Sequence, residues 1–313
     1  MASNWVPIVA GTALVFLAAC GSDSGGDELL DPGPREGACA DSTRVGQFEI
    51  ALRDTFTAVQ GKITDAVTPY LISEVVESMG TCTLMRPPTL FCSPSCGTGT
   101  TCDANGACVP VAAGASVGVV TVSGLKAPVE MTASAPVYFY TNTGTLDHPG
   151  FDEGDDIVLN ASGEGAVQAF ALGGVGVAPL SLSVSSVTLD TDLPLQLTWA
   201  APGQADAGTM HINLNIAQHG GTPGWIECDV PDTGSFELPV ALTNQLLASG
   251  FSGFPSVALT RRSADSVDTE VGCVDLLVES ALTMEIEIPG LTSCSDDPDC
   301  QPPETCLDDL TCG

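Results

Sequence analysis

Basic residues are scarce in this sequence. Eight Lys and Arg stand against 39 Asp and Glu, which gives a formal net charge of −31. A chain with this charge repels phosphate backbones and anionic membrane surfaces, so we expect no nucleic-acid partner. Solubility at a cell exterior or in saline surroundings accounts for the acidic surplus, and the alternative is cation binding.

Aromatic residues and helical periodicity are also scarce. Phe, Trp and Tyr make up 5% of the chain although hydrophobic residues reach 44%, so the core must consist mainly of Val, Leu, Ile and Ala. Apolar and polar residues instead alternate with a period of two, which is the pattern of half-buried β-strands. Clear examples are residues 193–199, 212–216, 274–278 and 282–288. The one expected helix covers residues 240–248, with Gly250 as its C-terminal stop.

The spacing of these strands predicts the fold class. Gly, Pro and Asp separate the strand segments at short intervals, as in antiparallel sandwiches and open barrels. We therefore predict a mainly β protein, in which an antiparallel β-sandwich-like domain carries two small disulfide-rich modules. The expected divisions are a lipoprotein signal peptide (1–19), a lipid-anchored flexible tether (20–38), a β-rich N-terminal unit (39–82), a Cys-rich mini-module (83–110), the β-sandwich-like domain (111–290) and a C-terminal Cys-rich mini-module (291–313).

The first two divisions follow from the N-terminal residues. Residues 5–19 form an uncharged apolar run that is shorter than the ~20 residues of a membrane span but has the length of a signal-peptide core. The sequence LAAC at 17–20 resembles the lipobox of bacterial lipoproteins, although Lys and Arg are missing from residues 2–4. The resemblance implies that Cys20 is lipidated and anchors the mature chain, and that Gly21 favours export to the outer membrane or cell surface.

Thirteen cysteines point to an oxidising compartment, because reducing compartments leave thiols free. If lipidation takes Cys20, 13 − 1 = 12 remain, an even number that can pair completely. We predict that Cys39 pairs with Cys82 and that Cys228 pairs with Cys273, the latter at about 4 kcal/mol of stabilisation. The other cysteines form two sets of four, each with three possible pairings: Cys92, Cys96, Cys102 and Cys108, and Cys294, Cys300, Cys306 and Cys312.

Segments within the β-rich region carry a family resemblance. The sequences at 211–239, 252–262 and 272–276 resemble uncharacterised cysteine-rich surface lipoproteins of the myxobacterial type, and the resemblance spans most of residues 40–290. It implies the anchor, the β-rich domain and the Cys framework. It implies no ligand, because that family has no established activity. The C-terminal module is similar to a dickkopf-type Cys-rich motif.

Candidate chemistry is sparse. The sequence GASVG at 114–118 matches the nucleophile-elbow pattern, but a β-branched strand rather than a helix follows Ser116, so we do not expect a catalytic serine. Carboxylates are densest around a sharp turn, where hard oxygen ligands suit calcium. The candidate calcium ligands are Asp147, Asp152, Glu153, Asp155 and Asp156.

We therefore expect a non-enzymatic surface protein that is held on the membrane by its N-terminal lipid and binds or adheres to an extracellular protein or glycan. Two alternatives stay open: a secreted hydrolase that uses carboxylates near residues 152–156, and a purely structural envelope component. Two of those carboxylates about 5–9 Å apart in a cleft would favour the hydrolase. The lack of a concave pocket would favour the structural role.

The anchor is testable by itself. Substituting Cys20→Ser should abolish incorporation of radiolabelled palmitate, because the thiol that receives the diacylglycerol is gone. Labelling is measured on the immunoprecipitated protein, with the unaltered chain as the positive control. Labelling that survives the substitution would contradict an anchor at Cys20.

Overall fold

The structure is a computed structural model that describes residues 30–204, 208–219, 221 and 223–313. The predicted lipidation residue Cys20 and the signal segment lie outside the described residues. The described chain is mainly β, with several sheets and disulfide-rich segments, which confirms the predicted fold class. In the same described part, no helix has the length and apolar character needed to cross a membrane.

The largest sheet has ten strands. Their order is β3-β4-β15-β14-β17-β18-β1-β2-β9, and β12 pairs with the last residues of β18. The bounds are β1 (Arg44–Leu52), β2 (Thr57–Ile63), β3 (Glu74–Met79), β4 (Cys82–Arg86), β9 (Phe139–Thr141), β12 (Ser186–Thr188), β14 (Thr209–Asn215), β15 (Trp225–Pro231), β17 (Ser256–Thr269) and β18 (Gly272–Glu287).

Smaller elements complete the fold. A four-stranded sheet has the order β11-β10-β7-β8, while β13 pairs with β16 and β5 with β6. The bounds are β5 (Thr100–Cys102), β6 (Cys108–Pro110), β7 (Val120–Ser123), β8 (Val129–Met131), β10 (Asp156–Ala161), β11 (Phe170–Val175), β13 (Leu195–Thr198) and β16 (Ser235–Leu238), with short 3-10 turns η1 (Pro69–Leu71) and η2 (Asp297–Asp299). The predicted helix is confirmed as α1 (Val240–Ala248), and Gly250 after it has a φ of +102°.

The hairpin of β17 and β18 is the spine of the large sheet. Its register runs without a break from Ser256 opposite Glu285 to Thr269 opposite Gly272. The two alternating segments expected at 274–278 and 282–288 are thus parts of one long strand. The first half of β18 pairs in parallel with β1, and its end pairs in parallel with β12.

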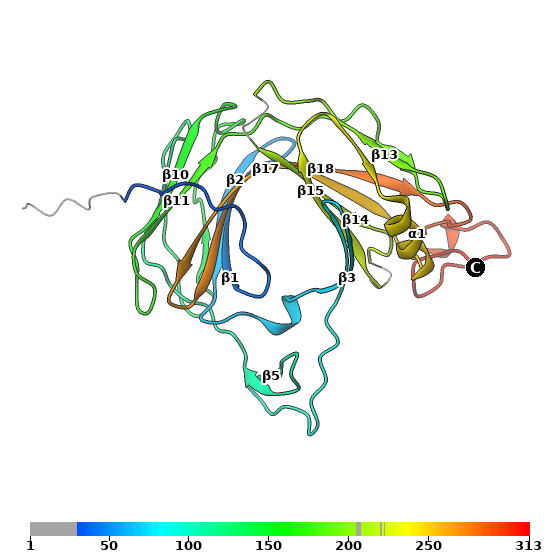
Figure 1. Ribbon diagram of the computed structural model, residues 1–313, viewed down its shortest axis with the longest axis horizontal. Helices are drawn as coiled ribbons and strands as arrows, with labels where there is room; N and C mark the ends of the chain where they lie inside the picture. Colours follow the sequence, from blue (N-terminus) through cyan, green and yellow to red (C-terminus); the bar gives the residue numbers. More distant parts are fainter. Residues whose placement is uncertain (1–29, 205–207, 220, 222) are drawn as a thin grey trace, which may run out of the picture.

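Two hydrophobic cores lie on the same face of this sheet. In β18, Val274, Leu276 and Val278 belong to the first core, while Met284 and Ile286 belong to the second. All five are separated by even numbers of residues, so their side chains point to one side of the strand. Figure 1 shows the result as an arch, with β10 and β11 outside one end, β13 outside the other, and β1 and β3 toward the inner side.

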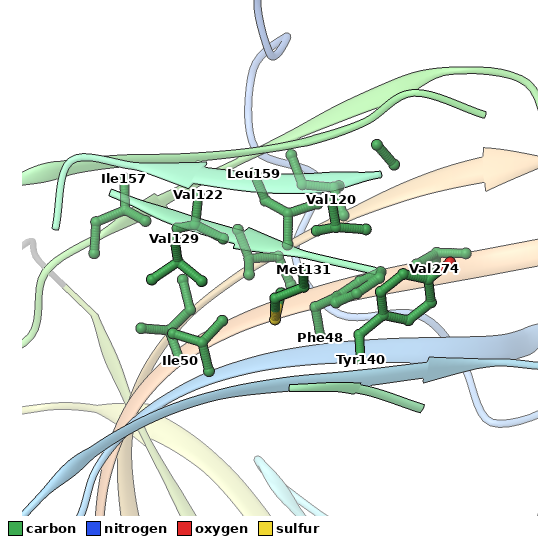
Figure 2. Packing of buried hydrophobic residues seen from close by; sticks show 14 of the residues in the cluster. Phe48, Ile50, Val120, Val122, Val129, Met131, Tyr140, Ile157, Leu159 and Val274 are labelled. Carbon is green, nitrogen blue, oxygen red and sulfur yellow. The ribbon is translucent and has the colours of Figure 1, made fainter. Parts of the chain in front are cut away.

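The first core fills the space between the large sheet and the four-stranded sheet. Phe48 and Ile50 of β1 face residues of the opposite layer, and the rings of Phe48 and Tyr140 lie 5.6 Å apart at 60° (Figure 2). The second layer contributes Val120, Val122, Val129, Met131, Ile157 and Leu159. As the composition indicates, aliphatic side chains supply most of this core.

The second core lies under β13, β16 and α1. The helix buries Leu242 and Leu246 against it, and Trp199 is 6% exposed at its border. The large sheet supplies alternate residues of β14, β15 and β17, namely Met210, Ile212, Leu214, Ile226, Cys228, Val230, Val257 and Leu259. The predicted strand alternation around 212–216 therefore marks a core-facing strand.

A polar seam separates the two cores. Arg261 is 2% exposed and forms an ion pair with buried Asp232, which also accepts the indole N–H of Trp199 at 2.6 Å. The guanidinium donates further hydrogen bonds to three carbonyl oxygens, those of Ala178, Pro179 and Ala200. The Asp232 carboxylate and backbone from both covering layers therefore satisfy Arg261, because Ala178 and Pro179 follow β11 and Ala200 follows β13.

Hydroxyl and carboxylate groups extend the seam. Asp265 accepts the Gly173 N–H at 2.7 Å, Ser263 accepts the Val175 N–H at 3.1 Å, and Ser280 accepts the Leu180 N–H at 2.9 Å. In the same place a Cβ on Gly174 would lie 2.5 Å from Val278, so β11 approaches β18 closely because that residue is glycine. The edge of β11 is thus satisfied by side chains instead of a further strand.

The predicted long-range disulfides are wrong in their pairing. Cys39 pairs with Cys273, and Cys82 pairs with Cys228, so both predicted bridges exchange partners. The reason is the sheet order: Arg44 of β1 lies in register with Cys273, and Cys82 of β4 lies directly opposite Cys228 of β15. Both bridges therefore connect parts of the chain that are neighbours in the sheet and distant in the sequence.

The N-terminal unit expected at 39–82 is likewise not separate. Its strands β1 and β2 belong to the large sheet, in which β1 lies between β18 and β2. Both strands bury residues in the first core, which they share with strands from beyond residue 111.

The mini-modules have the same disulfide order. The first pairs Cys92 with Cys102 and Cys96 with Cys108. The second pairs its cysteines in the same first-to-third and second-to-fourth order, as Cys294–Cys306 and Cys300–Cys312. In such short segments the bridges supply order that apolar burial cannot.

Truncation of Arg261 should show how much the seam contributes to the stability of the fold. Arg261→Ala leaves the Asp232 carboxylate buried without its partner, so the free energy of unfolding should fall by about 3–5 kcal/mol. The adjacent Arg262→Ala is the matched control, because its partner Asp229 has a side chain that is 56% exposed, and it should cost less than about 1 kcal/mol. Urea unfolding without reductant measures both, and equal losses would contradict the assignment.

Candidate functional site

The inner face of the large sheet is polar where the outer face is apolar. The residues that alternate with the core positions on neighbouring strands are mostly charged or amide side chains. They are Gln47 and Glu49 of β1, Asp275 and Glu279 of β18, Arg262 of β17, His211 and Asn213 of β14, and Glu227 and Asp229 of β15. Because these strands are adjacent in the sheet order, the side chains form one continuous field.

A cavity of about 500 Å³ opens on this face. Its floor comes from β18, β17, β14 and β15, through Asp275, Arg262, His211 and Glu227 among others. One wall is the N-terminal segment 38–44, and the opposite wall is formed by residues 72–75 with Met85. The site therefore collects residues that are far apart in the sequence, from Ala38 to Leu277.

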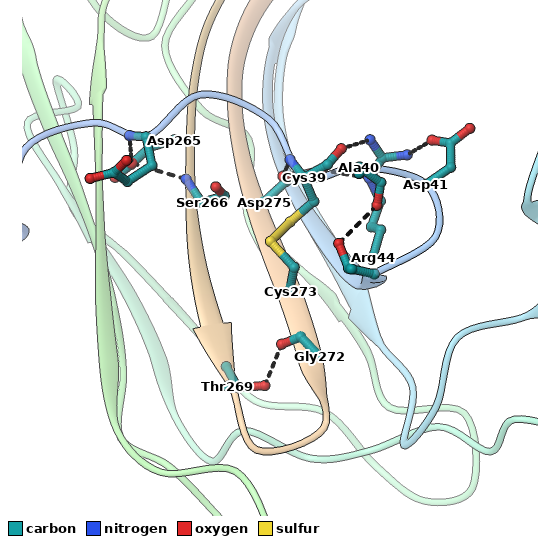
Figure 3. Close-up of a disulfide and its surroundings, with 12 residues drawn as sticks. Cys39, Ala40, Asp41, Arg44, Asp265, Ser266, Thr269, Gly272, Cys273 and Asp275 are labelled. Atoms are coloured by element: carbon teal, nitrogen blue, oxygen red, sulfur yellow. Dashed lines mark hydrogen bonds and ion pairs between the residues drawn. A yellow bond between two sulfur atoms is a disulfide. The ribbon is translucent and has the colours of Figure 1, made fainter.

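The N-terminal wall is held by a buried carboxylate (Figure 3). Asp275 is fully buried and accepts the Cys39 N–H at 2.5 Å and the Arg44 Nε–H at 2.6 Å. Arg44 in turn donates to Asp41 Oδ1 and to the Cys39 carbonyl, both at 2.7 Å. With the Cys39–Cys273 bridge beside them, these contacts fix the wall to the start of β18.

A second group centres on Asp229. His211 Nδ1 lies 3.2 Å from Asp229 Oδ1, and Arg262 donates to the same oxygen at 2.8 Å. Partial burial raises the pKa of this carboxyl, but His211 and Arg262 outweigh burial and hold the pKa below its usual value. Asp229 is therefore an oriented carboxylate at neutral pH.

Glu227 is oriented in a similar way. Its Oε1 accepts the indole N–H of half-buried Trp225 at 2.6 Å and the Asn213 amide at 3.3 Å. Trp225, Glu227 and Asp229 occupy alternate positions of β15, so they share the inner face. An aromatic ring and two positioned carboxylates thus line one strand.

Two acids face each other beyond the cavity. Burial, and then the neighbouring Glu49 carboxylate, raise the pKa of Glu279 to about 7, against the opposite influence of Arg53 and Arg262. Arg53 pairs with Glu49 and lies 3.7 Å from Glu279. The Gln60 amide also donates to Glu49 at 3.1 Å. At neutral pH Glu279 therefore carries a proton for part of the time.

The structure does not bring the five candidate calcium ligands together. Asp152 is 71% exposed and pairs with Lys126, Asp155 caps the Asp152 N–H, and Glu153 accepts the Gln204 N–H at 2.7 Å. Among the described residues, no three of the predicted ligands, which also include Asp147 and Asp156, offer ligand atoms within 4.8 Å of one another. Asp152, Glu153 and Asp155 instead have separate partners, so this arrangement does not support the predicted calcium site.

The charged inner face was not found from the sequence. Its residues are spread from 47 to 279 and are each flanked by buried positions, so they were indistinguishable from ordinary solvent-facing strand residues. The doublet Arg261-Arg262 was the available signal, since adjacent strand residues must point to opposite faces.

Known proteins offer little guidance. Neither a protein-family model nor a curated protein matches the chain. Among solved structures, the chain is similar to the FN1–FN3 domains of chicken CNTN1, with 7% sequence identity over 72% of this chain and 71% of that chain, and a TM-score of 0.19. A similarity of this size carries no argument about fold or function.

Glu279 should make stability depend on pH. Because its pKa is about 7 in the folded protein and 4.5 without the fold, the folded state holds the extra proton between these values, and stability falls as the pH rises through this window. Glu279→Gln should remove that slope and stabilise the protein by about 3 kcal/mol at pH 8. Unfolding midpoints from pH 4 to 8 measure this, with exposed Glu77→Gln as a control, and an unchanged slope would contradict it.

Proposed function

We propose that this chain is a lipid-anchored, non-enzymatic cell-surface protein whose inner sheet face binds an extracellular protein or glycan. Export is supported by the disulfides: the six bridges use twelve of the thirteen cysteines, and the one left is Cys20. Lipidation of Cys20 accounts for the odd cysteine and for the apolar run before it. The outer membrane or cell surface is the proposed location.

The cavity on the inner face is the observation that carries the binding role. Ligand sites are concave and contain a few polar groups in fixed orientations. Here a space of about 500 Å³ is lined by side chains that neighbouring residues already hold, such as Asp229 between His211 and Arg262. Because these side chains are already ordered, they lose little conformational entropy when a partner binds.

A non-enzymatic role is supported by how the charged groups are used. Arg44 and Arg262 are committed to ion pairs with Asp275 and Asp229. The only nucleophile motif of the sequence, around Ser116, hydrogen-bonds to Glu164 and Tyr140 instead of a histidine. We therefore assign these groups to recognition and to holding the cavity open.

Capture from cell-surface extracts tests the proposed function. The chain carrying Cys20→Ser is immobilised, and bound surface proteins and envelope sugars are recovered with and without calcium. Adding Arg262→Ala and His211→Ala should lower recovery about tenfold, because Asp229 loses both residues that orient it. The control is Lys126→Ala with His148→Ala, which likewise removes one basic residue and one histidine, both outside the cavity. Equal recovery by both double variants would contradict a role for the inner face.

A further inference from the structure

The inner face over β14 and β15 is an unpartnered sheet face. On the outer face, the same strands bury Ile212, Leu214 and Ile226 in the second core beneath β13, β16 and α1. On the inner face, no second layer of strands covers them within the described residues. The inner face of β14 and β15 is therefore accessible to a partner from outside the chain.

The open face presents an ordered row of groups. Trp225, Glu227 and Asp229 follow one another at every second residue of β15, so adjacent members are about 6.8 Å apart. Each carboxylate has one oxygen fixed by hydrogen bonds. Within the described part of the chain, the other oxygen of each accepts no hydrogen bond. The row therefore offers two oriented carboxylate oxygens beside an indole ring.

The charge of the cavity selects the chemistry of the occupant. Four carboxylates line it, those of Asp41, Glu227, Asp229 and Asp275, against the two guanidinium groups of Arg44 and Arg262. Both arginines are already paired, and the chain as a whole carries a net charge of −31. An anionic polymer would be repelled, and a neutral one would leave the surplus negative charge unpaired.

We propose that the Trp225–Glu227–Asp229 row docks an extended, Lys- or Arg-rich segment of an extracellular protein. The inference rests on the proposed function, because it names a partner for the same inner face. In an extended peptide, alternate side chains repeat at about 6.8 Å, which matches the spacing of the row. One basic side chain pairs with each carboxylate, and a third stacks on the indole by a cation–π contact.

The wall of the cavity suits the rest of such a segment. Val75 is 63% exposed, and Ile72 and Met85 lie beside it in the lining. These apolar surfaces accommodate the aliphatic stems of Lys and Arg, which cover apolar surface while the charged ends reach the carboxylates. A sugar would bury its hydroxyl groups against the same apolar wall at a cost.

Peptide binding to the full chain, purified in a nonionic detergent, tests the inference. The probe is a fluorescent peptide of four Lys-Thr repeats, its matched control has four Gln-Thr repeats, and maltohexaose serves as a neutral glycan. Anisotropy and calorimetry give Kd at about 50 and 300 mM NaCl. The Lys peptide should bind about tenfold more tightly than the Gln peptide and weaken at the higher salt concentration.

Charge-matched variants decide whether the row is the site. Glu227→Gln with Asp229→Asn should weaken Lys-peptide binding about tenfold, whereas Glu304→Gln with Asp308→Asn, which removes two charges from the C-terminal module, should leave Kd within about twofold. Equal loss in both double variants would show attraction by bulk charge and overturn the proposal. Equal binding of both peptides would also overturn it. Maltohexaose binding that needs Trp225 but neither carboxylate would overturn the peptide partner and leave the proposed function in place.

Discussion

Arg261 and Asp232 form an ion pair at the place where one continuous sheet passes from the first core to the second. A charge buried this deeply is tolerated only when its partner and its remaining donors are satisfied, and here three carbonyl oxygens complete the set. Ala178 and Pro179 lie just after β11 of the first covering layer, and Ala200 lies just after β13 of the second. The ion pair thus fixes where the first covering layer ends and the second begins, and both cores depend on that boundary.

The same hairpin determines what the opposite face can do. Strand geometry sends Arg261 to the seam and Arg262, the next residue, to the inner face, where it orients Asp229. Ser280 and Glu279 divide in the same way on β18, one receiving the Leu180 N–H and the other facing Glu49. Arg261 and Ser280 bind the covering layers on the outer face, so the alternate residues Arg262 and Glu279 can be charged without disturbing either core. The candidate site and the polar seam therefore lie on opposite faces of the same two strands, β17 and β18.

Local features of the fold could be predicted from the sequence, but its pairings could not. Period-two alternation located β14 and both halves of β18, and Gly250 marked the end of α1, because each depends on residues within a few positions. Disulfide partners depend on which strands are neighbours. Nothing near Cys39 indicates that β1 lies beside β18, so the prediction paired it with Cys82, the next cysteine along the chain. The calcium prediction had the same origin, since it took carboxylates that are close in sequence for carboxylates that are close in space.

The N-terminal segment connects the proposed anchor to the cavity. Asn160 accepts the Leu30 N–H at 2.9 Å and Asp265 accepts the Glu36 N–H at 3.0 Å, so the segment is held at two points before the Cys39–Cys273 bridge closes onto β18. The residues that follow the bridge form a wall of the cavity. If Cys20 is anchored as proposed, tension from a bound partner reaches the lipid through this bridge and the spine of the sheet. Ala38 and Cys39 lie on this path and also line the cavity, so the bridge passes the tension into β18 before it reaches Asp41 and Arg44.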